Sequence, residues 1–141
     1  MQTNTNIDID DARILIAGAV EKANEIGVPM CIAVCDGAGN LVAFERMTGG
    51  KVTSITIAID KAYTAAAAKK ATHDYAAASQ PGKPAFGINS AINGRLMVVA
   101  GGLPIVVRDE VVGSIGISSG TPDEDRLCAQ AGLNAFLKAI A

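Results

Sequence analysis

The chain has 141 residues, with 12 basic and 14 acidic side chains and a formal net charge of −2. This length fits one compact domain over residues 1–141. The nearly balanced charge leaves no basic stripe, which argues against nucleic acid as a partner. No apolar run reaches the roughly 18 residues of a membrane-spanning helix, and the N-terminal residues lack the basic and apolar regions of a secretion signal. We therefore expect a cytoplasmic protein that binds neither nucleic acid nor membranes.

The composition points to self-association. Half of the residues are hydrophobic, yet aromatic residues make up only 4% and tryptophan is absent. Small residues, mainly alanine and glycine, take their place, and each buries little area. A single copy would therefore combine a modest core with an apolar exterior that further copies could cover. The sequence predicts a homo-oligomer.

The N-terminal part predicts a helix followed by a β-hairpin. Apolar residues recur at steps of three and four over Asp10–Glu25, and Gly27 with Pro29 ends this helix. Two strands follow, Met30–Cys35 and Leu41–Met47. The loop between them contains two glycines and two Asx residues, a composition typical of a tight hairpin.

The rest of the chain predicts a second helix, three short strands and a last helix. The second helix covers Thr53–Ala71, and whether Thr72–Ser79 extends it stays open. Three apolar runs are separated by spacers short enough only for antiparallel neighbours; they are Leu96–Ala100, Leu103–Arg108 and Val111–Ser118. The last helix begins with a capping box over residues 121–124 and has proline at its first position.

Together these elements predict an α+β fold, a three-layer-like sandwich similar to profilin and PAS domains, in which helices flank a five-stranded antiparallel sheet. Neither GxGxxG nor GxxxxGK[ST] occurs, so a nucleotide site has little support. Residues 118–121 could bind an anion at the start of the last helix. Three acidic residues in its first turn favour a structural cap instead.

The three cysteines indicate neither a disulfide nor a metal site. On one strand, the four-residue step from Cys31 to Cys35 spans about 13 Å, too far for a disulfide or a shared ion. We expect both, and Cys128 in the last helix, to be small buried hydrophobic residues.

His73 is the only histidine and the only candidate metal ligand. Lys61, Lys69 and His73 are separated by multiples of four, so a continuous helix would place them along one flank. A neutral imidazole there could bind haem iron beside cations suited to carboxylates. The alternative is a solvated histidine at a fraying helix end.

Four further charged residues could form a site for an organic acid. Arg46 and Lys61 are cations beside predicted buried elements and could bind a carboxylate. Asp36 and Asp125 could move a proton. Surface salt bridges and subunit contacts are the alternative roles.

Several segments in sequence order resemble the GlcG/HbpS family, and the match covers nearly the whole chain. They are Gly101–Pro104, Val111–Thr121 with Asp125 after it, Asp36–Val42, Arg46–Met47 and Lys61–Ala65. The resemblance implies a sandwich with a five-stranded antiparallel sheet that assembles into dimers or larger rings such as octamers. Haem binding, and in some accounts haem degradation, is the activity attached to this family, which includes the C-terminal domain of PduO-type proteins. Ser119 departs from the pattern, because the family usually has glycine there.

Three hypotheses follow. The first is a cytoplasmic homo-oligomer that binds haem or a related tetrapyrrole, with His73 as axial ligand and Lys61, Lys69 or Arg46 on the propionates. The second is a small catabolic enzyme, an isomerase or hydratase, that binds an organic acid through Arg46 or Lys61 and moves its proton with Asp36 or Asp125. The third is an accessory oligomer without chemistry of its own.

Overall fold

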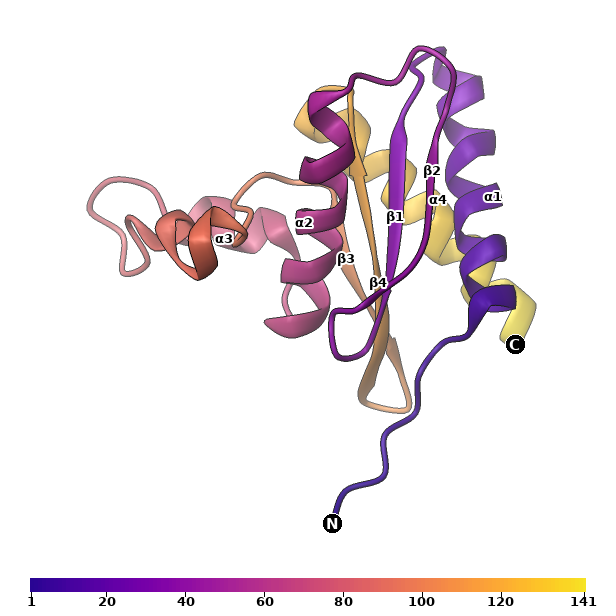
Figure 1. The fold of residues 1–141 in the computed structure, drawn as a ribbon, viewed down its shortest axis with the longest axis horizontal. Coiled ribbons are helices and arrows are strands. Elements are labelled where there is room, and N and C mark those ends of the chain that lie inside the picture. The colour runs from indigo at the N-terminus through magenta and orange to yellow at the C-terminus, as the bar shows by residue number, and fades with distance from the viewer.

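The computed structural model describes residues 1–141, in which three long helices flank a four-stranded antiparallel sheet and a short fourth helix projects away from it (Figure 1). The elements in chain order are α1 (Ile9–Ile26), β1 (Cys31–Asp36), β2 (Leu41–Arg46), α2 (Thr53–Ala67), α3 (Thr72–Ala78), β3 (Gly102–Val107), β4 (Glu110–Ser118) and α4 (Pro122–Ile140), with two 3-10 turns at Ile88–Ser90 and Ile92–Gly94. The α+β fold class is therefore confirmed.

The sheet has four strands in the order β2-β1-β4-β3, and the prediction of five was wrong. The run Leu96–Ala100 forms no strand. Its backbone bonds to α2 instead: the Met97 amide donates to Thr64 Oγ1, and the Thr64 hydroxyl donates to the Arg95 carbonyl. The predicted meander is thus the single hairpin β3–β4. Its strand β3 is an edge strand, where Pro104 is tolerated.

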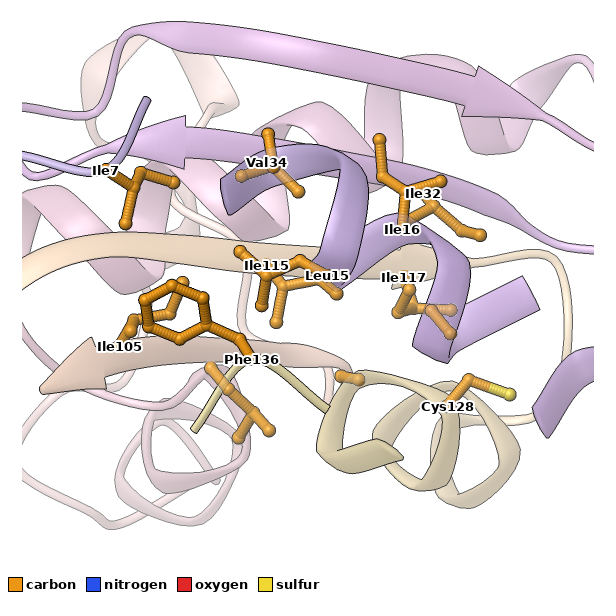
Figure 2. Close-up of a cluster of buried hydrophobic side chains, with 14 of the residues drawn as sticks. Ile7, Leu15, Ile16, Ile32, Val34, Ile105, Ile115, Ile117, Cys128 and Phe136 are labelled. Atoms are coloured by element: carbon orange, nitrogen blue, oxygen red, sulfur yellow. The ribbon is translucent and has the colours of Figure 1, made fainter. Parts of the chain in front are cut away.

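The helices cover the two faces of the sheet unequally. Helices α1 and α4 lie together on one face, and α2 covers the other (Figure 1). The larger core lies beneath α1 and α4, where Leu15 and Phe136 meet isoleucines of β1, β3 and β4 (Figure 2). Alternate residues of β1 face opposite ways, so Ile32 and Val34 join this core while its cysteines face α2.

The face of the sheet beneath α2 is built from small residues. Its cluster contains only cysteine and alanine at fully buried positions: Cys31, Ala33, Cys35, Ala58, Ala62 and Ala66. Strand β4 adds Ser114, whose hydroxyl donates to the Ala62 carbonyl at 2.6 Å, and Gly116. A Cβ on Gly116 would overlap backbone atoms of Ala58 and Ala62. The small residues therefore let the α2 backbone approach the sheet closely.

The two long helices have the ends that the sequence predicted, with one difference. Helix α4 has Thr121 as N-cap. The Thr121 side chain accepts a hydrogen bond from the Glu124 amide, and the Glu124 side chain accepts one from the Thr121 amide. Helix α1 begins with a reciprocal box as well, but its N-cap is Asp8, two residues before the predicted start. Gly27 ends α1 in the left-handed region at φ 72°. These caps satisfy backbone groups that the helix ends would otherwise leave without partners.

Helix α2 ends at Ala67, four residues before the predicted end. The Lys69 amide bonds to the Ala66 carbonyl and the Lys70 amide to the Ala65 carbonyl. This is a Schellman motif, with Lys69 at φ 56° in the position that usually carries glycine. Residues 72–78 then form the separate helix α3, and the chain from α3 to residue 95 projects away from the sheet as an arm (Figure 1).

Candidate functional site

The structure separates the residues that the sequence placed on one helix flank. Because α2 ends at Ala67, Lys69 and His73 do not continue the flank that contains Lys61. Lys69 is exposed and lines a polar hollow of about 370 Å³ together with the N-terminal segment and Asp109. Lys70 lies over the ring of Tyr75, 4.7 Å from its centroid. Lys61, Lys69 and His73 therefore do not lie along the one helix flank that the sequence predicted.

His73 lies in the first turn of α3, at the base of the arm. Its Nε2 is 3.6 Å from Asp74 Oδ1, and its side chain is 24% exposed. Its Nδ1 is buried and has no hydrogen-bond partner in the chain. Buried polar atoms without a partner are rare in folded proteins. The contact with Asp74 is longer than a hydrogen bond, so neither imidazole nitrogen is hydrogen-bonded within the chain.

Lys61 and Asp125 are the two predicted site residues that the structure brings together. Lys61 Nζ donates to Asp125 Oδ2 at 2.9 Å and to the Ile117 carbonyl at 2.9 Å, and both side chains are buried. Asp125 Oδ1 in turn accepts from the Gly120 amide at 2.9 Å. Lys61 thus holds a carboxylate, but it is the carboxylate of Asp125, and the pair joins α2 to α4 across the sheet.

Burial sets the electrostatics of this pair. Loss of water lowers the pKa of Lys61 and raises the pKa of Asp125, because desolvation disfavours both charges. The attraction between the two groups opposes both shifts. Gly101, at φ 125°, leaves the space for them, since a Cβ there would lie 2.9 Å from Lys61 Nζ. The two side chains are only 1% and 4% exposed.

Asp36 and Arg46 lie apart from this pair. Asp36 Oδ1 accepts from the amides of Ala38 and Asn40 at 3.0 Å each, so the carboxylate holds the β1–β2 turn. Arg46 is exposed at the end of β2 and forms no ion pair.

The start of α4 is a structural cap. Thr121 and Asp125 use the amides of Glu124 and Gly120, which would otherwise face an anion. Ser119 is buried and takes φ 111°, a conformation that favours glycine, and its hydroxyl accepts from the Lys51 amide at 3.0 Å. That hydrogen bond gives a physical reason for serine at a position where glycine was expected.

The cysteines are buried and unpaired, as expected. Burial raises the pKa of Cys35 and of Cys128 to about 11, so both thiols stay protonated near neutral pH. No group of three potential metal-ligating side chains occurs in the chain. None of the helices has the length and apolar character needed to cross a membrane.

The sequence did not single out Arg95, which the fold places on Tyr63. The guanidinium carbon lies 3.9 Å from the centre of the Tyr63 ring, and Nε pairs with Asp60 at 2.9 Å. These residues are about 30 positions apart, and no local pattern connects them. Apolar residues are exposed on the same arm, notably Phe86 at 67% and Ile92 at 50%.

Comparison with known proteins shows which family and which relatives this chain resembles. Residues 7–134 match the family described as haem degrading protein HbpS-like. A protein of Citrobacter freundii, described as an uncharacterized 15.0 kDa protein in the dhaT-dhaS intergenic region, is 40% identical over 122 residues, which cover 86% of each chain.

Two solved structures are close in fold. Klebsiella pneumoniae protein ORFY is 34% identical with a TM-score of 0.95, over 97% of this chain and 94% of that one. A structure described as the PduOC:Heme complex is 30% identical with a TM-score of 0.89, over 93% of this chain and 95% of that one. The resemblance found in the sequence motifs is thereby confirmed, and this chain belongs to the HbpS-like family.

Proposed function

We propose that this chain is a cytoplasmic, homo-oligomeric protein that binds haem or a related tetrapyrrole. The observation that carries the proposal is the likeness to the PduOC:Heme complex over 93% of the chain at 30% identity. Family membership supports it as well, since the matching family is described as haem degrading.

The arm and its base carry the residue types that a haem site needs. A haem site needs an iron ligand, an apolar surface for the macrocycle and cations for the propionates. His73 offers an imidazole whose side chain is 24% exposed. Phe86 and Ile92 are exposed apolar residues. Arg95 ends the arm with a side chain that is 41% exposed, and Lys69 is an exposed cation shortly before the arm begins. Bound haem would supply an iron centre for ligand binding or oxidation, and the chain would set its axial ligand and burial.

Of the cations expected to bind the haem propionates, Lys61 is replaced. Lys61 is 1% exposed and already bonded to Asp125, so we assign the propionates to cations on the surface, Lys69, Arg46 or Arg95. The hollow beside Tyr63 and Ile92 has about 190 Å³, below the roughly 300–1,000 Å³ of ordinary ligand pockets. A macrocycle on the arm would remain largely uncovered in one chain, which supports a site completed by a second copy.

No observation favours the second hypothesis, a proton-transfer enzyme. Asp36 holds a turn, and Asp125 is bonded to Lys61 and Gly120. Neither carboxylate faces a hollow with an arginine or lysine ready for a substrate.

A haem titration of the purified chain tests the proposal. We expect a Soret band that saturates at a fixed ratio of haem to chain, and a shifted and weakened band in His73→Ala. The matched control is Tyr75→Phe, a change two positions along α3 that keeps the ring. A spectrum of His73→Ala identical to the wild type would remove His73 as ligand, and no saturable band in the wild type would overturn the proposed function.

A further inference from the structure

Arg95 is held in a fixed orientation on the arm. Its guanidinium stacks on the Tyr63 ring at 3.9 Å, a distance typical of a cation–π contact. Its Nε donates to Asp60 Oδ1 at 2.9 Å, and the Asp60 side chain is 12% exposed. A long side chain usually loses rotamer entropy when it binds a ligand. Here the two contacts have already ordered it.

The binding edge of this guanidinium is free. Only Nε forms a hydrogen bond, so the two terminal Nη groups have no partner within the chain. The Arg95 side chain is 41% exposed, which leaves this edge open to solvent. A planar guanidinium with free N–H groups matches a carboxylate in a two-point contact.

An apolar hollow begins at the same tyrosine. It has a volume of about 190 Å³, and its lining residues are Tyr63, Thr64, Ala67, Ala68, Ile92 and Leu96. Thr64 is the only aliphatic polar residue among them, and its hydroxyl is already bonded to the Met97 amide and the Arg95 carbonyl. The hollow therefore offers apolar contact, and it shares Tyr63 with Arg95, whose guanidinium stacks on that ring.

Backbone strain occurs at the rim of this hollow. Ile92 and the next residue, Asn93, have φ of 57° and 54°. A β-branched residue in the left-handed region is a rare outlier that carries backbone strain. Such strain concentrates at ligand sites. Here it places the Ile92 side chain in the hollow wall, three residues before Arg95.

We propose that Arg95 and this hollow form a binding subsite for a carboxylate with a short apolar chain. The volume equals roughly six water molecules, which suits a chain of about three or four carbons. Two sources carry this chemistry: a free short-chain carboxylic acid, or the propionate arm of a tetrapyrrole. The subsite does not depend on the proposed function, because the free acid can be tested without haem.

The first experiment is a titration with butanoate, followed by tyrosine fluorescence. The chain has no tryptophan and two tyrosines, so in a Tyr75→Phe background Tyr63 alone reports. We expect a saturable change with butanoate, none with butylamine and a much weaker one with formate. Arg95→Gln should abolish the butanoate response. Arg13→Gln, which also loses an ion pair with an aspartate on the surface, should retain it.

Two more variants separate binding from folding. Ala68→Leu leaves Arg95 in place and fills the hollow, so it should weaken butanoate at least tenfold. Asp60→Asn keeps an acceptor for Nε but removes a negative charge that repels the ligand, so it should strengthen butanoate several-fold. Where butanoate binds, a response to formate of the same size, or an unchanged butanoate affinity in Ala68→Leu, would overturn the role of the hollow and with it the proposal.

The second experiment identifies the source by comparing haem with its dimethyl ester in Soret titrations. If the ligand is a propionate, Arg95→Gln weakens haem several-fold and leaves the ester unchanged, even where butanoate gives no response. If the ligand is a free acid, butanoate responds and both haem forms are insensitive to Arg95→Gln. The proposal is wrong if Arg95→Gln alters neither butanoate nor haem binding.

Discussion

Lys61 and Asp125 form the one ion pair of this chain in which both side chains are buried. The cost of removing both charges from water is offset by the 2.9 Å contact and by further bonds to the Ile117 carbonyl and the Gly120 amide. At the scale of single residues, this pair fastens helices on opposite faces of the sheet.

We predict that Lys61→Met destabilises the chain by about 3–5 kcal/mol, because it leaves a buried carboxylate without its partner. The measurement is urea unfolding followed by circular dichroism. In Arg13→Met, which breaks the exposed pair with Asp10, the loss should stay below about 1 kcal/mol. A loss in Lys61→Met no larger than in Arg13→Met would show that the pair contributes little.

The buried thiols predict a loss of stability at alkaline pH. Desolvation raises the pKa of Cys35 and Cys128 from 9.0 to about 11, with nearby carboxylates adding to the shift. Because the folded pKa lies above the unfolded value, folding favours the protonated thiol. The stabilisation from this preference is complete below pH 9 and is lost as pH rises through 11. Each thiol contributes up to roughly 3 kcal/mol by this route.

The test compares the free energy of unfolding of the wild type with that of the double variant Cys35→Ala, Cys128→Ala from pH 8 to pH 11. The variant should be less stable at pH 8, because cavities form, yet lose less stability above pH 9. Parallel curves for the two proteins would contradict the assigned shifts.

The side-chain contacts that the sequence did not predict join residues far apart along the chain. Lys61 was expected to bind a carboxylate of a ligand or of a partner. In the structure it is bonded to Asp125, 64 positions later in the same chain, and no local pattern indicates this pairing. Arg95 was missed, because its partners Asp60 and Tyr63 lie on another element. Such contacts are set by the packing of α2 against the arm, which no spacing along the chain encodes.

At the scale of elements, the end of helix α2 determines where the arm begins. The alanines of residues 65–68 favour a continuous helix, and the sequence predicted one to Ala71. The chain instead turns at Lys69 in the left-handed region. The usual signal for such a turn is glycine, and a lysine in its place hides the helix end from sequence patterns.

We predict that Lys69→Gly stabilises the chain by about 0.5 kcal/mol. Glycine relieves the left-handed strain of about 1–2 kcal/mol but loses more entropy on folding. Thermal unfolding measures the change, with the exposed loop substitution Lys83→Gly as control, which should be neutral or slightly destabilising. A lower melting temperature for Lys69→Gly would mean that the lysine side chain stabilises the turn.

The missing fifth strand likewise depends on contacts between residues that are far apart in the sequence. An apolar run of five residues such as Leu96–Ala100 is equally compatible with a strand and with a packed loop. The Thr64 hydroxyl, which occupies backbone groups of Met97 and Arg95, decides in favour of the loop. The hairpin β1–β2 and the capped helices α1 and α4 were predictable, because their signals lie within a few residues of each other.

At the scale of the whole molecule, a compact sandwich carries a projecting arm. The sheet and its three long helices bury the core, whereas the arm exposes Phe86 and Ile92 and carries His73 at its base. The haem proposal uses these two exposed apolar side chains together with His73. The proposed haem site and the proposed assembly thus use the same part of the molecule.

Sedimentation velocity of the haem-loaded protein, recorded at the Soret wavelength and at the protein wavelength, tests both parts of this account together. We predict that haem absorbance sediments with a single species of at least two 14.3 kDa chains. A protein that sediments as one chain, with haem absorbance left behind at the rate of free haem, would contradict the account.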